Sequence, residues 1–277
     1  MLTGLIAYTR TALLYRLLRG RWVTREALQQ FSGDSPENVA WKLLLSAEGL
    51  ERCCNLSLEL HLHFIHNARL KVVRTLLPPG DVILDLGGAY SPLYRMGYPH
   101  PFKKLVLIDL PPERRHQEFR RVELERHSRG GEISILYADM SELSGIDDGS
   151  VDLVWAGQVI EHLSPETGRR MSQHVFRVLR RGGSFCLDTP NGLLSSMHAA
   201  TAGKRMIHPD HKIEYGPSDL RRMLKACGFD IAVEKGLCHM VRTLRSGQFS
   251  YEDFIFGNPI ADEVEDSYLQ YYQCVKP

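Results

Sequence analysis

Short apolar runs bounded by acidic residues, glycine or proline recur through the centre of the chain. The first, Val82-Ile83-Leu84-Asp85-Leu86, lies between the breaker Pro78-Pro79-Gly80-Asp81 and the pair Gly87-Gly88. Similar runs follow at residues 105–109, 133–139 and 151–155. Such runs are too short for buried helices and are typical of strands covered on both faces, as in parallel sheets. We therefore predict a parallel sheet whose strand ends meet at one edge.

Segments with helix-start signals alternate with these strands. Ser164 precedes a proline and a glutamate, which favours a helix that we expect to stop at Gly182-Gly183, before a fifth strand. Ser218 favours a second helix that ends at Gly228. Two further strands are expected at residues 229–233 and 268–277. Strands alternating with helices predict a doubly wound α/β domain.

Residues 1–72 differ from the rest because they show helical patterning without strand alternation. We interpret them as an N-terminal helical extension. Its first helix combines an apolar stripe with several arginines, so three alternatives stay open. In the first alternative the helix packs on its own domain, and in the second it contacts a partner subunit in a homodimer. In the third it makes peripheral contact with an anionic membrane surface.

Composition narrows the class of protein. The 277 residues are 43% hydrophobic and 24% charged, which is typical of a globular chain. The net charge of +1 offers no general attraction for nucleic acid, so we predict no nucleic-acid partner. Six cysteines without a C-x-x-C pair favour free thiols in a reducing compartment. With neither a signal-peptide arrangement nor a bilayer-length apolar run, we expect a cytoplasmic protein.

The glycine turn after the first strand indicates a ligand site. Glycine lets the backbone approach a ligand closely, and open α/β sheets bind ligands outside the carboxyl ends of their strands. A dinucleotide fingerprint would need glycines where this chain has Ala89 and Pro92. The carboxylate of Asp85 instead suits the ammonium and sulfonium groups of S-adenosylmethionine. The pattern favours this cationic cofactor over a nicotinamide dinucleotide.

Asp85-Leu86-Gly87-Gly88 resembles the first motif of the class I S-adenosylmethionine-dependent methyltransferases, of the type 11/23-like family. That motif reads acid-x-Gly-x-Gly-x-Gly, so Ala89 and Ser91 depart from it. Residues 150–163 resemble the family's fourth strand and its loop ending Glu-His-hydrophobic, and residues 218–229 resemble a later helix. The resemblance covers residues 73–277 and implies a Rossmann-like, seven-stranded, mostly parallel sheet completed by an antiparallel hairpin.

The resemblance also implies which residues bind S-adenosylmethionine. Asp109 lies 22 positions after Gly87, near the spacing expected of a ribose-binding acid, and matches that acid in the family. Asp139 matches the acid that hydrogen-bonds the adenine amino group, and the loop from Gln158 lies beside the transferable methyl group. The predicted cofactor-binding residues are Asp85, Gly87, Gly88, Asp109, Leu110, Asp139, Met140 and Gln158.

Two histidines, His162 and His211, are the catalytic candidates, because histidine titrates in the range suited to accepting a hydroxyl proton. His208 and Glu214 add donors beside His211 that suit a metal. We prefer His211 as a substrate-side group and predict no metal. The fifth strand ends Thr189-Pro190-Asn191, whose polar groups we expect to face the same edge.

These observations predict a methyltransferase domain at residues 73–277, with insertions at 192–216 and 244–265. We expect methyl transfer to a hydroxyl of a small molecule or saccharide. The second insertion is rich in aromatic residues, and we expect it either to cover the substrate pocket or to make a subunit contact. Two alternatives stay open: a catalytically silent scaffold or cofactor sensor with the same fold, and, less favoured, an NAD-dependent oxidoreductase.

Overall fold

The computed structural model describes residues 12, 15, 23–44, 46, 60–90, 92–114 and 131–277. The chain forms two compact units, residues 1–63 and 64–277. The predicted first amphipathic helix lies almost wholly outside the described residues, as does Ser91. Among the helices that are described, none combines the length and apolarity needed to cross a bilayer.

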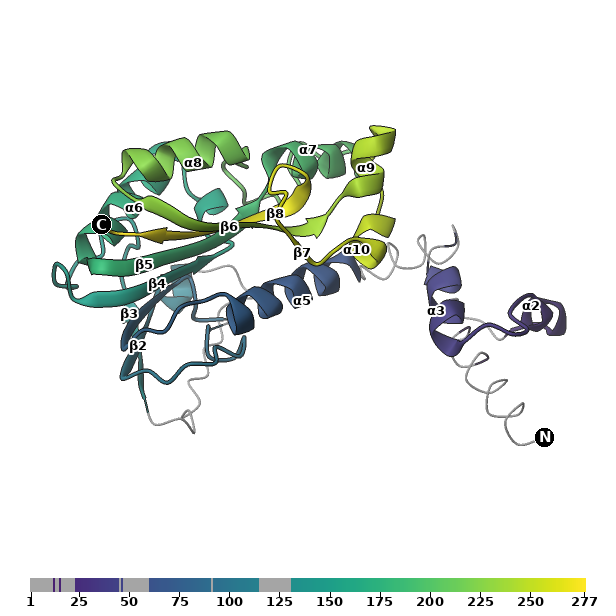
Figure 1. Cartoon of the computed structure of the whole chain (residues 1–277), viewed down its shortest axis with the longest axis horizontal. Helices are drawn as coiled ribbons and strands as arrows, with labels where there is room; N and C mark the ends of the chain where they lie inside the picture. Colours follow the sequence, from purple (N-terminus) through teal and green to yellow (C-terminus); the bar gives the residue numbers. More distant parts are fainter. Residues whose placement is uncertain are drawn as a thin grey trace. The chain divides into compact units, whose positions relative to one another are not determined.

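The smaller unit contains two short helices, α2 (Arg25–Gln30) and α3 (Pro36–Leu44), drawn in purple in Figure 1. Ser35 caps the start of helix α3, because its Oγ accepts the Asn38 amide hydrogen at 3.2 Å. Buried Tyr15, Val39 and Leu43 form a small apolar core.

The larger unit is built on an eight-stranded sheet in the order β3-β2-β1-β4-β5-β8-β6-β7. Strands β1 to β5 are parallel, while β8 runs antiparallel between β5 and β6. The strands are β1 (Val82–Leu86), β2 (Lys104–Asp109), β3 (Glu132–Tyr137), β4 (Val151–Gly157), β5 (Leu179–Pro190), β6 (Asp230–His239), β7 (Ile260–Ala261) and β8 (Ser267–Val275). The predicted mostly parallel α/β sheet is confirmed, with β7 of the second insertion as an additional edge strand.

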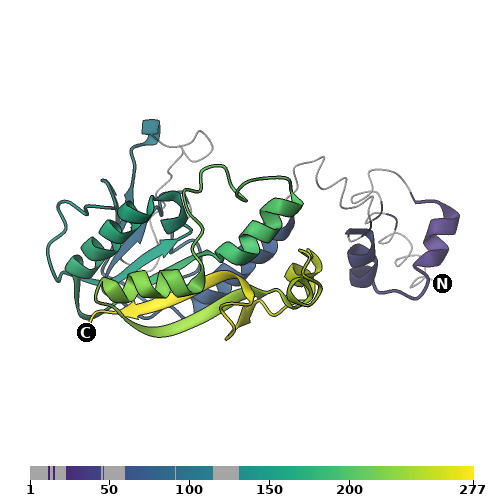
Figure 2. The ribbon, with the colours of Figure 1, turned by 90° about the horizontal axis from the view of Figure 1, so that it is seen from above.

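Helices cover both faces of this sheet, as Figures 1 and 2 show. Residues of α6 and α8 share one apolar core with the sheet, whereas residues of α5, α7 and α10 belong to the core of the other face. Neighbouring residues of β1 alternate between the cores, since Leu84 lies in the first and Ile83 in the second. The helices are α5 (Leu60–Thr75), α6 (Pro165–Val178), α7 (Gly192–Thr201), α8 (Pro217–Ala226), α9 (Val241–Ser246) and α10 (Glu252–Phe256), with 3-10 helices η1 (Pro112–Arg114) and η3 (Ile160–His162).

Two predicted helix boundaries are wrong. Helix α8 begins at Pro217, with Gly216 rather than Ser218 as its N-cap. Helix α6 ends at Val178 rather than at Gly182-Gly183, and Leu179 is already extended. Leu179 pairs with Val151 of β4, and the register shifts before Leu153. The two glycines therefore lie inside β5, because sheet pairing at Leu179 overrides the local stop signal.

The aromatic residues of the second insertion are largely interior. His198 of α7 is buried, stacks on Phe249 at 4.2 Å between ring centroids, and hydrogen-bonds the hydroxyls of Tyr251 and Tyr268. Phe254 packs in the same core. This insertion is thus anchored to the sheet by its own aromatic side chains.

Candidate active site

The turn after β1 is held against β2. The Gly87 amide donates to the Ile108 carbonyl at 2.8 Å, and Gly87 has a φ of +72°. This left-handed conformation favours glycine. A Cβ at position 87 would also lie 3.0 Å from Val159, in the loop after β4. The turn therefore brings the ends of three strands close together.

Asp85 lies beneath this turn and is buried. Its Oδ2 accepts the Leu93 amide hydrogen at 2.7 Å. A Cβ at Gly88 would lie 2.2 Å from the Asp85 Cγ, so the second glycine is required by this carboxyl group. Burial raises the pKa of Asp85 to about 7, against the opposing hydrogen bond from Leu93. A nearby cation would favour its ionised form.

Asp109 connects the same turn to the end of β2. Its Oδ1 accepts the Leu110 amide hydrogen at 2.7 Å, and its Oδ2 accepts that of Ala89 at 3.2 Å. Ala89 thus takes part in the turn through its backbone, although the family motif has glycine there. Asp109 is half-buried, which leaves part of the carboxylate accessible to a ligand.

Asp139 follows β3 and is exposed. Its Oδ1 accepts the Ser141 amide hydrogen at 2.8 Å. Desolvation alone would raise the pKa of Asp139, but hydrogen bonds from Ser141 and the charge of Arg170 outweigh it and lower the pKa. The neighbouring Met140 packs on the core below. An ionised acceptor is therefore presented at the end of β3.

A buried ion pair supports the end of β4. Gln158 has a φ of +59°, and its backbone and side-chain amides each donate to Asp188 at 2.9 Å. Asp188 is fully buried and also accepts the Arg69 Nε–H at 2.8 Å. Gln158 is thus positioned by this pair, and one N–H of its side-chain amide is already hydrogen-bonded to Asp188. The sequence analysis missed Arg69 and Asp188, which lie 119 positions apart.

Glu161 lies in η3, beside the histidines, and is fully buried. Its Oε2 accepts the Thr189 hydroxyl hydrogen at 2.9 Å, while its Oε1 has no hydrogen-bond partner within the part of the chain that the structure describes. Burial raises the pKa of Glu161 to about 7. Its carbonyl accepts the Lys212 amide hydrogen at 2.7 Å, which ties the first insertion to this loop.

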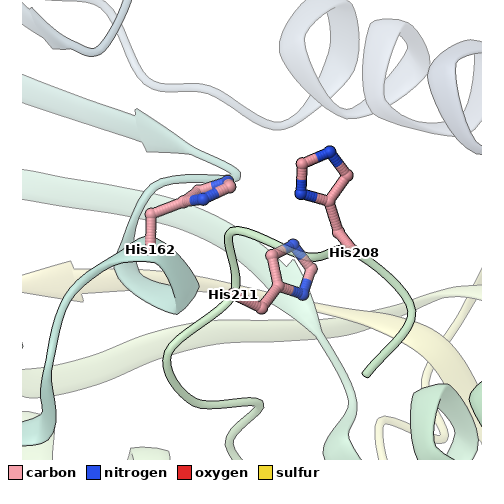
Figure 3. A group of neighbouring side chains, drawn as sticks. All are labelled: His162, His208 and His211. Atoms are coloured by element: carbon pink, nitrogen blue, oxygen red, sulfur yellow. The ribbon is translucent and has the colours of Figure 1, made fainter. Parts of the chain in front are cut away.

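The fold brings both predicted catalytic histidines together and adds a third (Figure 3). Ring centroids are 4.9 Å apart for His162 and His211, and 5.3 Å apart for His208 and His211. Desolvation, with the charges of His211 and His208, lowers the pKa of His162 to about 4, although part of its ring reaches solvent. His162 is therefore a neutral base at physiological pH.

A short chain of hydrogen bonds orients His211. Its Nδ1 lies 2.7 Å from Oε1 of Glu214, whose Oε2 accepts the Ser195 hydroxyl hydrogen at 2.6 Å. Desolvation would raise the pKa of Glu214, but these hydrogen bonds outweigh it and lower the pKa. An ionised Glu214 holds the hydrogen of His211 on Nδ1, so that Nε2 can accept a proton. Ser195 carried no signal in the sequence.

A pocket of about 610 Å³ opens beside these histidines. Several of its lining side chains are cationic, which makes it a favourable environment for polar or anionic ligands. The lining residues are Lys204, Arg205, Met206, His208, Pro209, His211 and Lys212.

The expectation for Asn191 is wrong. Its side chain is buried rather than facing the ligand edge. The Asn191 Nδ2 donates to the carbonyls of Glu265 and Ser267, and its Oδ1 caps α7 by accepting the Leu193 amide hydrogen at 3.1 Å. Thr189 is likewise buried, with its hydroxyl on Glu161. Internal packing therefore uses both polar groups.

The described residues fit S-adenosylmethionine. Asp85, Asp109 and Asp139 lie at or near the carboxyl ends of adjacent parallel strands, and two of them retain access to a ligand. Carboxylates there can accept hydrogen bonds from an amine and from ribose hydroxyls. They also suit a cofactor that carries positive charge.

Comparisons with known proteins agree with this geometry. Residues 84–187 match the family model described as a methyltransferase domain. A probable S-adenosylmethionine-dependent methyltransferase of Mycolicibacterium smegmatis is 34% identical over 107 residues, covering 39% of each chain. A Mycobacterium tuberculosis (strain H37Rv) protein with the same description is 34% identical over 112 residues, or 40% of this chain and 38% of its own. The chain thus matches less than half the length of these curated relatives.

Solved structures share the fold. An S-adenosylmethionine-dependent methyltransferase from Thermotoga maritima has a TM-score of 0.53 at 16% identity, covering 82% of this chain and 98% of that one. Another from Archaeoglobus fulgidus has a TM-score of 0.50 at 16% identity, covering 76% and 92%. The strand-end motifs, the sheet order and the family match agree: residues 84–187 match the methyltransferase domain family, and the larger unit has the fold of S-adenosylmethionine-dependent methyltransferases.

Proposed function

We propose that the chain transfers a methyl group from S-adenosylmethionine to a hydroxyl of a small molecule or saccharide. One observation carries the proposal. The loop from Gln158 to His162 lies beside the turn after β1, through the close approach of Val159 to Gly87. The same loop ends at His162, whose ring centroid is 4.9 Å from that of His211. Cofactor-binding groups and proton-accepting groups therefore lie along one edge of the same sheet.

The residues of this edge have separable roles. Asp85 and Asp109 would hold the cofactor through its charge and its hydroxyls. When bound, S-adenosylmethionine supplies a methyl group on a sulfonium, which is already a good leaving group. Alignment and exclusion of water then dominate the acceleration.

A hydroxyl acceptor must also lose its proton. Nε2 of His211 can accept it, since Glu214 stabilises the imidazolium that forms from the opposite side of the ring, 2.7 Å away. His162 remains neutral near it, because its pKa is lowered to about 4, and can accept a hydrogen bond. Glu161 lies buried behind both and keeps its loop in place through Thr189.

The cationic pocket supports a small polar acceptor. Lys204, Arg205 and Lys212 line it beside His211, and its volume of about 610 Å³ is within the range of small-molecule sites. A sugar or a metabolite with an acidic substituent would present hydroxyls to the histidine while its charge faces the lysines.

Calorimetry with S-adenosylhomocysteine, and separately with NAD, tests the cofactor. We expect binding of the first only, weakened at least tenfold by Asp109→Ala and unchanged by Asp219→Ala, which removes an exposed acid on α8. Binding of NAD alone, or equal binding by both variants, would refute the cofactor site.

Methyl transfer to a panel of sugars and small hydroxyl compounds tests the reaction. We expect His211→Ala to bind S-adenosylhomocysteine normally and to lose most turnover. Cofactor binding without turnover on any acceptor would favour the silent scaffold, and unchanged turnover in the variant would remove His211 from the mechanism.

A further inference from the structure

Three imidazole groups from separate parts of the chain converge beside the ligand edge. His162 ends η3, whereas His208 and His211 belong to the first insertion. A ligand nitrogen from each lies within 4.8 Å of the other two. Figure 3 shows the three rings gathered around one space. We propose that His162, His208 and His211 bind one Zn²⁺ ion.

The distances are close to those of a zinc site. Tetrahedral Zn²⁺ with Zn–N bonds of about 2.0–2.1 Å places its ligand nitrogens about 3.3 Å apart. The widest separation allowed here, 4.8 Å, must therefore shrink by about 1.5 Å at most. His162 and His208 are exposed, so rotation of their side chains supplies this movement without disturbing the core.

The surroundings of two rings match those of metal ligands. A ligating histidine usually donates its second ring N–H to a carboxylate or a backbone carbonyl, which fixes the ring and its tautomer. His211 does so through Nδ1 to Glu214 at 2.7 Å, and His162 hydrogen-bonds the backbone of Asp210. Both rings thus present their remaining nitrogen to the shared space.

His208 must rearrange slightly. Its Nδ1 accepts the Asp210 amide hydrogen at 3.2 Å, and a neutral imidazole has a single lone pair in the ring plane. Metal binding at His208 therefore replaces this long hydrogen bond. Asp210 is exposed, so water can take over its amide hydrogen.

The donor set selects the metal. Imidazole suits zinc and the late first-row metals, whereas Mg²⁺ and Ca²⁺ take oxygen ligands. Three histidines leave the fourth tetrahedral position open, as in catalytic zinc sites. His208 and His211 also line the pocket of about 610 Å³. If the proposed methyl transfer holds, a hydroxyl bound at this position would lose its proton to solvent more readily because the cation stabilises the oxyanion. His211 would then act in the metal-bound form as a zinc ligand rather than as the proton acceptor.

The test uses the full chain, stripped of metal with a chelator. Titration with Zn²⁺ in a calorimeter should give one site with a micromolar or tighter dissociation constant. Co²⁺ in the same site should show the intense visible absorption of tetrahedral nitrogen coordination. His208→Ala should weaken Zn²⁺ binding at least 30-fold, and Glu214→Gln about tenfold or more because His211 loses its orienting partner.

A matched control is His63→Ala, which removes an exposed histidine of α5 and should leave Zn²⁺ binding unchanged. Equal Zn²⁺ affinity in the parent and in the His208→Ala variant, or a Co²⁺ spectrum of octahedral oxygen coordination, would overturn the zinc site. Circular dichroism confirms that each variant folds. S-adenosylhomocysteine binding, measured on the same samples without metal, reports separately on the proposed function.

Discussion

Replacing Gly88 with alanine tests how the turn after β1 is built. An ideal Cβ at this position would lie 2.2 Å from Cγ of Asp85, and 2.3 and 2.4 Å from its two carboxyl oxygens. Ordinary contact begins at 3.4 Å, so the carboxyl group or the turn must move by about 1 Å. The Asp85 side chain is buried.

The cost follows from what this movement breaks. A shift of that size lengthens the 2.7 Å hydrogen bond between Asp85 and the Leu93 amide beyond bonding distance. Leaving a buried polar group unpaired costs about 1–3 kcal/mol, and overpacking costs about 1–3 kcal/mol more. We expect Gly88→Ala to lower the free energy of unfolding by about 2–6 kcal/mol, and to weaken S-adenosylhomocysteine binding because the turn changes shape.

Urea unfolding and calorimetry measure both effects. Gly216→Ala is the matched control, since Gly216 has a φ of −70° and a Cβ there would meet no described atom within 4 Å. We expect the control to change stability by less than about 1 kcal/mol and to leave cofactor binding intact. A Gly88→Ala variant with the parent's stability and affinity would refute the packing of Asp85 beneath the turn.

Three further variants test other features. Arg69→Ala removes the cation that pairs with the buried Asp188 carboxylate, and should lower the free energy of unfolding, measured in urea, by about 3–5 kcal/mol. Arg222→Ala, which removes an exposed ion pair, should lower it by less than about 1 kcal/mol. Because burial raises the pKa of Asp85 from 3.8 to about 7, its protonated form favours the folded state, and the parent should lose stability as pH rises through this range. Asp85→Asn should reduce that slope by about half, because Glu161, whose pKa burial also raises to about 7, contributes the remainder. The parent's affinity for S-adenosylmethionine should rise above pH 7, and the variant should lose this rise. An unchanged slope in the variant would assign it to other groups. Asn191→Ala removes the cap of α7 and leaves the carbonyls of Glu265 and Ser267 without the Asn191 amide. Urea unfolding should therefore show a free energy of unfolding lower by about 2–4 kcal/mol. A smaller decrease would mean that water replaces the amide.

The strand positions could be predicted because their signals are local. An apolar run, an acid and a glycine pair define β1 and its turn within a few residues, and the same pattern predicts β2 and β4. The helix start at Ser164 was predictable for the same reason, since a serine cap acts on the amides of the next turn. Where a distant partner competes with a local signal, as Val151 does at Leu179, the prediction was wrong.

The sequence by itself determined the α/β alternation and the acids that line the ligand edge, because backbone propensity, turn chemistry and strand order all depend on neighbouring residues. Only the tertiary structure decided that Arg69 meets Asp188, that Asn191 turns inward, and that His162 meets His208 and His211. These pairings join residues far apart in the chain. Their free energy comes from burial and hydrogen bonding that exist only once the sheet and its insertions have packed together.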